Sequence, residues 1–376
     1  MKQSKNQKSF GVMLAIGLIL SLFFVFCGQQ TSQKDALPLL KPLIITEAAK
    51  HDTDDPAIWL HPTDPAQSLI IGTDKDEDGA LYVYDLAGKI IEEKTVRNLK
   101  RPNNVDIEYG FMLQGTPTDI AVTTERLENK IRVFRLPEMQ AIDNGGIEVF
   151  VGETQRDPMG IALYKRPADK AIFAIVGRKE GPQDGRYLWQ YRLEDDGTGK
   201  VAGMKVREFG KYSGIKEIEA IAVDDALGYV YYSDEQVGVR KYYADPDRQD
   251  SDQELALFAT DGFAEDHEGI SIYPINDGTG YILISDQQAN QFHIFKREGE
   301  PNNPHEHKCI KVVKVSTNES DGSDVTNATL NATFPNGLFV AMSDNKTFQF
   351  YSWADIAGDE LIVAPNGIPE NQKKSE

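Results

Sequence analysis

Cysteine is nearly absent from this sequence of 376 residues, which holds only Cys27 and Cys309. Cys27 stands at the end of an apolar amino-terminal stretch that has the character of an export segment. If that segment is removed, or if Cys27 is acylated, Cys309 has no partner for an intrachain disulfide. A disulfide-stapled scaffold is therefore excluded, and stability must come from a hydrophobic core and from any metal that the protein binds.

Basic side chains are also in short supply, because 40 Lys and Arg face 59 Asp and Glu, for a formal net charge of −19. A protein that holds nucleic acid by bulk electrostatics needs a basic face, so this class is excluded. The remaining composition, 40% hydrophobic and 26% charged, is that of an ordinary globular protein. The acidic surplus favours three kinds of binding partner: cations, basic proteins, or an anionic substrate that arrives with metal ions.

The amino terminus carries a long uncharged apolar run at residues 10–26, preceded by Lys2, Lys5 and Lys8. This pattern predicts an export signal in residues 1–27. Cys27, directly after the run, is typical of a bacterial lipoprotein whose cysteine is acylated; plain secretion and an uncleaved anchor are the alternatives. Loss of residues 1–27 removes three lysines and no acid, so the net charge becomes −22. We expect an exported protein, secreted, periplasmic or membrane-anchored, with residues 28–41 as a tether.

One apolar-aromatic hexapeptide pattern recurs six times, at residues 81–86, 131–136, 188–193, 239–244, 292–297 and 348–353. Successive starts are 50 to 57 residues apart. Each copy is preceded by two further short strand patterns, and five copies are followed by a fourth. A period of this length built from short strands indicates a β-propeller, in which each repeat is one blade.

The last repeat has only a weak fourth strand, whereas residues 42–46, PLIIT, lie before the first blade and belong to none. We therefore expect the amino-terminal strand to close the last blade. The prediction is an all-β, six-bladed propeller of four-stranded blades over residues 42–366, followed by a flexible tail at residues 367–376.

Carboxylates gather at the predicted ends of the inner strands, where a propeller places its binding site. They are Asp52, Asp54, Asp55, Glu217, Glu219, Asp266, Glu268, Asp321 and Asp324, with Glu235, Asp286 and Gln287 at the ends of neighbouring strands. Such acids repel each other unless cations lie between them, and oxygen ligands suit Ca²⁺. By contrast, we interpret His61 and His267 as structural, and Asp85, Asp195 and Asp225 as turn residues.

Basic residues end the equivalent strands of the first three blades: Lys75, Arg126, Arg178 and Lys179. One side of the predicted mouth is thus basic and the other acidic. Metals on the acidic half beside cations on the basic half fit a substrate with several phosphates.

The sequence resembles the β-propeller phytases, the calcium-dependent alkaline phytases (3-phytases) of bacteria. The resemblance is most specific at DDPAIWLHP (54–62), SLIIGTDK (68–75) and LYVYDL (81–86). NNVD (103–106), EAIAVDD (219–225), DHEG (266–269) and FPNGLFVA (334–341) follow in the family's order. It covers about residues 45–357, nearly all of the chain after the export segment.

The resemblance implies a phosphomonoesterase that hydrolyses phytate, myo-inositol hexakisphosphate, by attack of a calcium-bound water. It implies several structural and catalytic Ca²⁺ ions, a calcium complex of phytate or another inositol phosphate as substrate, and no covalent phosphoenzyme. We also expect the protein to be a monomer. The implied calcium ligands or close supports are Asp54, Asp55, Glu219, Glu235, Asp266, Glu268, Gln287 and Asp321. Lys75, Arg126 and Lys179 become phosphate-binding residues that act with Glu219 in catalysis, and we expect Arg178 to bind substrate beside them.

Three departures from the family pattern stand out. Met159 replaces a phosphate-contacting Tyr, an acidic position upstream of Asp321 falls on Val315 or Ser316, and residues 341–344 read AMSD. We therefore expect fewer or weaker metals. Two alternative functions stay open: a catalytically weak, calcium-dependent surface binding module, and a propeller hydrolase of lactones or esters, which only the fold supports.

Overall fold

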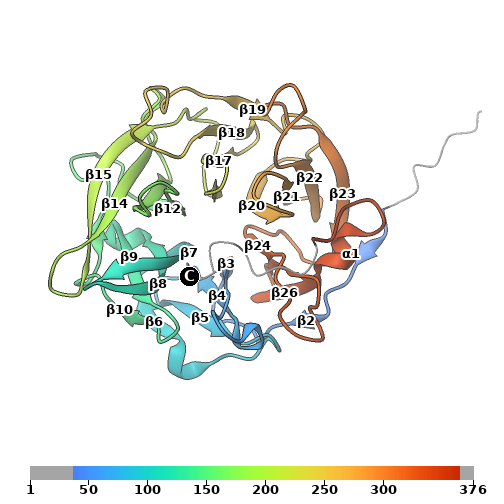
Figure 1. Cartoon of the computed structure of the whole chain (residues 1–376), viewed down its shortest axis with the longest axis horizontal. Coiled ribbons are helices and arrows are strands. Elements are labelled where there is room, and N and C mark those ends of the chain that lie inside the picture. Colours follow the sequence, from blue (N-terminus) through green and yellow to red (C-terminus); the bar gives the residue numbers. More distant parts are fainter. Residues whose placement is uncertain (1–36, 365–376) are drawn as a thin grey trace, which may run out of the picture. The chain divides into compact units, whose positions relative to one another are not determined.

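Six β-sheets follow one another in a ring and form a six-bladed β-propeller, which confirms the predicted fold class (Figure 1). The structure is a computed structural model that describes residues 37–364. The predicted export segment, most of the predicted tether and the predicted tail lie outside these residues. Within the described range, no helix is both long and apolar enough to cross a membrane.

The blades are formed one after another along the chain. In each blade the antiparallel strands lie side by side, with the first strand nearest the centre of the ring and later strands farther out. Blade 1 contains β3 (Thr53–Trp59), β4 (Leu69–Asp74), β5 (Gly79–Tyr84) and β6 (Val96–Leu99). Blade 2 contains β7 (Pro102–Leu113), β8 (Thr116–Glu125), β9 (Lys130–Arg135), β10 (Gln140–Ala141) and β11 (Ile147–Glu148). Blade 3 contains β12 (Pro158–Lys165), β13 (Ile172–Arg178), β14 (Leu188–Asp195) and β15 (Val201–Phe209).

The second half of the ring repeats this plan. Blade 4 contains β16 (Ile221–Asp224), β17 (Tyr229–Asp234), β18 (Gly238–Tyr243) and β19 (Ala256–Phe258). Blade 5 contains β20 (His267–Pro274), β21 (Gly280–Asp286), β22 (Gln291–Lys296) and β23 (Cys309–Val315), and blade 6 contains β24 (Ser323–Thr326), β25 (Leu338–Ser343) and β26 (Thr347–Ser352). Short helices are η1 (Pro65–Gln67), η2 (Glu92–Lys94), η3 (Arg126–Glu128) and α1 (Trp353–Ala357).

The hydrophobic core lies between neighbouring blades. The recurring hexapeptides form the third strand of each blade, and their side chains pack against the adjacent sheet. Between blades 1 and 6, for example, Ile70 and Tyr84 share one buried cluster with Phe348. Blade 1 approaches closely here, since a Cβ on Gly72 would meet the Phe348 ring at 2.2 Å. Each blade thus needs both neighbours to bury its apolar surface.

Strand β2 (Ile44–Ile45) closes the ring as predicted, because it pairs antiparallel with β26 as the outer strand of blade 6. The Leu43 N–H donates to the Phe350 carbonyl at 2.8 Å, and the Thr46 N–H donates to that of Phe348 at 3.0 Å. An additional strand, β1 (Leu39–Leu40), lies in the stretch expected to be a tether and pairs parallel with β23.

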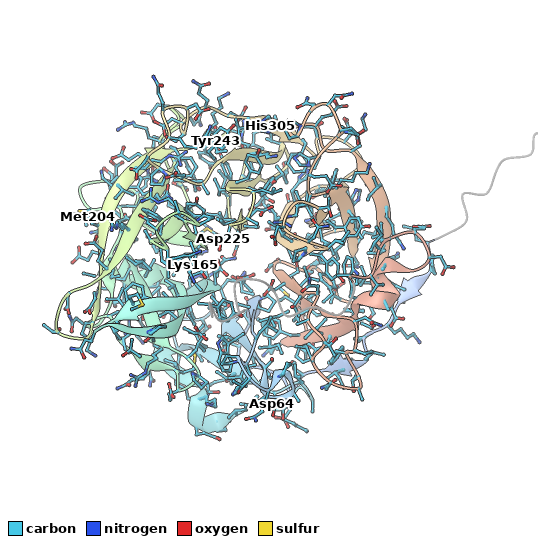
Figure 2. The ribbon with its side chains drawn as sticks, in the orientation of Figure 1. Asp64, Lys165, Met204, Asp225, Tyr243 and His305 are labelled. Carbon is cyan, nitrogen blue, oxygen red and sulfur yellow. The ribbon has the colours of Figure 1, made fainter. Side chains whose placement is uncertain are left out.

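Carboxylates near the ring axis tie adjacent blades together. Asp324 of blade 6 accepts the Ile58 N–H of blade 1, and Asp106 of blade 2 accepts the Leu163 N–H of blade 3. Asp225 of blade 4 accepts the Lys165 N–H of blade 3 at 2.9 Å, so its interpretation as a turn residue was incomplete. Figure 2 shows Lys165 and Asp225 close together on the inner side of the ring, whereas Met204 and Asp64 lie at its outer edge.

Candidate metal and phosphate site

The sequence-predicted site residues come from equivalent places in their blades. Asp54 and Glu268 lie at the beginning of inner strands, and Glu219 and Asp321 shortly precede inner strands. Lys75, Glu235 and Gln287 directly follow the second strands β4, β17 and β21. Because the first two strands of a blade are antiparallel, the start of one and the end of the next lie at the same edge. The fold therefore brings these side chains to one rim of the ring.

Lys75 links the acids of blades 1 and 6. Its Nζ lies 2.5 Å from Asp54 Oδ1 and 3.2 Å from Asp321 Oδ2. Asn103 extends this network into blades 2 and 4, because its Nδ2 donates to Asp54 Oδ2 at 2.9 Å and also to Glu219 Oε1. Gln287 of blade 5 donates to Asp321. Four predicted ligands and Lys75 thus form one connected group.

Three buried glutamates form a compact acidic centre next to this network. Oxygen atoms of Glu219, Glu235 and Glu268 all lie within 4.8 Å of one another. Glu268 Oε2 has no hydrogen-bond partner among residues 37–364, although Glu268 is only 4% exposed. A buried carboxylate oxygen without a partner is costly, and a bound cation would satisfy it.

The pKa shifts of these acids also fit a bound cation. Burial, followed by repulsion from Glu235, Glu219 and Asp321, raises the pKa of Glu268 well above its usual range. Burial also raises the pKa of Asp54, again with repulsion from Glu219. The pKa of Glu235 is raised to about 8, mainly by burial, although Lys216 opposes the shift. A cation between these groups would favour their ionised forms.

Asp266 lies at the side of the acidic centre and is held by three donors. Lys216 Nζ is 2.5 Å from Asp266 Oδ2, Gln236 Nε2 donates to Oδ1 at 2.9 Å, and Gln288 Nε2 donates to Oδ2 at 2.7 Å. Burial raises the pKa of Asp266, but these three hydrogen bonds outweigh it and leave the pKa below its ordinary value. Asp266 is therefore an ionised support beside the glutamates.

Two glycines allow the backbone to approach the acids. A Cβ on Gly160 would lie 1.9 Å from the Glu219 carbonyl oxygen, and a Cβ on Gly322 would lie 2.4 Å from Asp55 Oδ1. Any larger residue would displace the segment before β16 that carries Glu219, or the start of β3 that carries Asp55. Asp55 itself turns toward blade 2, where its Oδ2 accepts the Val105 N–H at 3.0 Å.

Two further predicted phosphate-binding residues, Lys179 and Arg126, differ in their surroundings. Lys179 follows β13, is 41% exposed and pairs with Glu217 at 2.9 Å. Arg126 begins η3 and is only 6% exposed, yet its Nε has no hydrogen-bond partner in the described part of the chain. Both retain capacity for an anion.

Arg178 differs from the other basic residues because its guanidinium is committed to the interior. It donates to the carbonyls of Tyr187, Gln155 and Arg186, and it stacks over Phe150 at 4.5 Å. With an exposure of 1%, Arg178 has a packing role that accounts for its position.

The departures from the family pattern have clear surroundings. Met159 is buried, and its carbonyl accepts from Thr124 Oγ1 at 2.7 Å. Ser316 donates to Gln349 at 2.8 Å, so a neutral hydrogen bond stands where an acid was expected. His267 is buried and its Nε2 contacts the Ala259 carbonyl, in keeping with a structural role.

The donor set at the rim fits a hard cation, because it consists of carboxylate and amide oxygens. Asn103 Oδ1 is buried and, like Glu268 Oε2, has no hydrogen-bond partner within residues 37–364. Two residues of this site, Asn103 and Lys216, were not among the predicted site residues. Asn103 lies in the NNVD motif but carries no charge, and Lys216 lies in an unrepeated loop.

Comparison with known proteins places the chain in a family. A family model described as Phytase matches residues 41–359. The 3-phytase of Bacillus subtilis (strain 168) is 32% identical over 326 residues, which cover 81% of this chain and 80% of that protein. The chain belongs to the Phytase family.

Proposed function

We propose that this protein is a calcium-dependent 3-phytase that releases phosphate from myo-inositol hexakisphosphate. The observation that carries the proposal is the buried acidic centre of Glu219, Glu235 and Glu268, whose oxygens lie within 4.8 Å of one another beside Lys75. Family membership and the similarity to the Bacillus subtilis 3-phytase support the substrate.

The side chains divide the work of binding. Glu219, Glu235, Glu268, Asp54 and Asp321 would hold calcium, with Asp55, Asp266 and Gln287 as further ligands or supports. Calcium bound there would supply positive charge to the phosphate oxygens and lower the pKa of the attacking water. Lys75 orients the group by holding Asp54 and Asp321, and its ammonium adds positive charge next to the phosphate that is cleaved.

Arg126 and Lys179 would bind a neighbouring phosphate. Arg126 offers an Nε that has no hydrogen-bond partner among residues 37–364, and Lys179 is partly exposed and pairs with Glu217. Hydrolysis forms a bond between the water oxygen and phosphorus and breaks the bond between phosphorus and the inositol oxygen. The proton lost by the water ends on the inositol hydroxyl or in solvent. Holding two phosphates fixes the ester that faces the acidic centre.

Incubation of the purified protein with sodium phytate, with Ca²⁺ or with a chelator, tests this proposal. We expect phosphate release between neutral and alkaline pH that depends on added Ca²⁺. Absence of calcium-dependent release across that range would contradict it. Analysis of the first inositol pentakisphosphate formed identifies the ester that is cleaved.

A second function is a calcium-dependent surface binding module with little turnover. Ser316 and the buried Met159 favour it, because both replace groups that the family pattern would use at the site. Calcium-stabilised binding of an inositol phosphate without phosphate release would support this alternative.

We also propose that residues 1–27 export the protein and that a lipid on Cys27 anchors it. Fractionation of cells that express the wild type or Cys27→Ser tests this proposal. The wild type should sediment with membranes and the variant should not. Equal distribution of both proteins would exclude a lipid anchor at Cys27.

A further inference from the structure

Lys216 is a cation within the acidic rim that belongs to the loop between β15 and β16. Its Nζ lies 2.9 Å from Glu235 Oε2 of blade 4 and 2.5 Å from Asp266 Oδ2 of blade 5. Glu235 is one of the three glutamates of the acidic centre. The ammonium of Lys216 therefore pairs with a carboxylate that a metal ion in this centre would also bind.

Lys216 differs from Lys75, the other ammonium of the rim, in how firmly it is held. The Lys216 side chain is 38% exposed, whereas that of Lys75 is 14% exposed and its partner Asp54 is fully buried. The Lys216 ammonium already borders water, and its withdrawal would leave Asp266 with its two glutamine donors and Glu235, only 2% exposed, in need of another cation. Lys216 is thus the easier of the two to displace.

The backbone around Lys216 is fixed, so its release needs only a change of side-chain rotamer. The Tyr212 hydroxyl donates to the Lys216 carbonyl, and the Glu217 carbonyl accepts the Glu235 N–H at 3.2 Å. The first contact lies within the loop, and the second joins the loop to blade 4 directly after Lys216. A long side chain on a fixed backbone can leave the acids without unfolding the rim.

We propose that Lys216 competes with the metal for the acidic centre. Without metal, its ammonium compensates the charge of Glu235 and Asp266. A divalent cation that binds the three glutamates of the centre displaces this ammonium. The choice of Ca²⁺ as that cation rests on the proposed function. Lys216 lowers the apparent calcium affinity, because binding must first break its contact with Glu235. In return, it stabilises the acidic rim when calcium is scarce.

Calorimetric titration of the full chain with CaCl₂ tests this inference in the wild type, Lys216→Gln and Lys211→Gln. Lys211 is the matched control, because it lies in the same loop but pairs with Glu254 and is 59% exposed. We expect Lys216→Gln to bind calcium about ten-fold or more tightly than the wild type, and Lys211→Gln to match the wild type. Calcium affinity in Lys216→Gln that is equal to or weaker than in the wild type would overturn the proposal.

Thermal unfolding of the same samples gives a second readout that does not depend on activity. In a chelator, Lys216→Gln should unfold at a lower temperature than the wild type, and calcium should raise its unfolding temperature by a larger amount. An equal increase in both proteins would contradict competition.

Phosphate release by the same samples separates this inference from the proposed function. A wild type that binds calcium but releases no phosphate from phytate would contradict the proposed function, and the comparison with Lys216→Gln would still stand. A wild type that binds no calcium would contradict both.

Discussion

Lys75 supplies the positive charge that compensates buried carboxylates of the rim. Its ammonium contacts Asp54, which is fully buried, and Asp321 on the opposite side of the junction between blades 1 and 6. Burial lowers the pKa of Lys75, but attraction from Asp54, Glu219 and Asp321 outweighs it and raises the pKa above its ordinary value. Lys75 therefore stays charged and holds the acids together.

Replacement of Lys75 by Met should destabilise the metal-free protein by about 3 kcal/mol, because Asp54 would lose the cation that compensates its burial. Urea unfolding in a chelator measures this loss. Lys89→Met is the control, since Lys89 and its partner Glu47 are both exposed and their pair should contribute little. Equal stability of Lys75→Met and the wild type would contradict this role.

His293 of β22 predicts a pH dependence of stability through its contact with Asp286. Its Nε2 lies 3.3 Å from Asp286 Oδ2, and its Nδ1 lies 4.0 Å from Cys309 Sγ. Burial lowers the pKa of His293, but the contacts with Asp286 and Cys309 outweigh it and raise the pKa to about 9. A raised histidine pKa stabilises the fold fully below the unfolded value near 6.5, and the contribution disappears as pH rises through about 9.

The variant His293→Gln should therefore be less stable than the wild type at pH 6, and the difference should shrink at pH 10. Urea unfolding at both pH values measures the change. His61→Gln, in the loop after β3, should show no such convergence. A stability difference for His293→Gln that is the same at both pH values would contradict the ion pair with Asp286.

The sequence predicted most of the rim because its acids recur at equivalent positions in several blades. Glu219 and Glu268 could be recognised by that recurrence, and the structure places them in one centre. Lys216 could not be recognised, because its role depends on how one loop bends toward blade 5. The interior position of Arg178 was also hidden, since a strand end gives no sign of which way its side chain turns.

At the level of elements, β2 matters more than its two residues suggest. It supplies the outer strand of blade 6 and ties the amino-terminal part of the described chain to the last blade (Figure 1). Besides two backbone hydrogen bonds, Thr46 Oγ1 accepts the Phe348 N–H at 2.9 Å. Blade 6 would otherwise expose the edge of β26.

Removal of β2 should weaken the fold without changing its rim. A chain that begins at residue 47 should lose about 3 kcal/mol relative to one that begins at residue 42, from three hydrogen bonds at about 1 kcal/mol each. This corresponds to an unfolding temperature lower by roughly 5 °C. Thermal unfolding of the two chains measures the difference, and equal unfolding temperatures would show that β2 does not close the ring.

The blades could be predicted because the hexapeptide repeats at a near-constant interval and forms the largely buried third strand. Strands β1 and β10 could not, because each has only two residues and shows no periodicity. Helix α1 left a local signal that was missed: Ser352, whose hydroxyl accepts the Ala354 N–H at its start. Short elements depend on neighbours that only the folded ring supplies.

At the level of the whole molecule, the carboxylates of the inner strands and the rim serve two tasks. Carboxylates near the axis, such as Asp106, Asp225 and Asp324, bond to backbone N–H groups of adjacent blades. Those at the rim converge on one another and leave Glu268 Oε2 without a partner within the described residues. The first group holds the ring together, and the second is available for a cation that would offset the charge of a phosphorylated substrate.

The most direct test asks whether the acidic centre holds the calcium that hydrolysis needs. It measures phosphate release from phytate as a function of free calcium in the wild type, Glu268→Gln and Glu265→Gln. Glu265 is an exposed neighbour and serves as the control. We predict that Glu268→Gln needs about ten-fold or more calcium for half-maximal release, while Glu265→Gln behaves like the wild type. Release that is independent of calcium, or identical calcium curves for Glu268→Gln and the wild type, would contradict this claim.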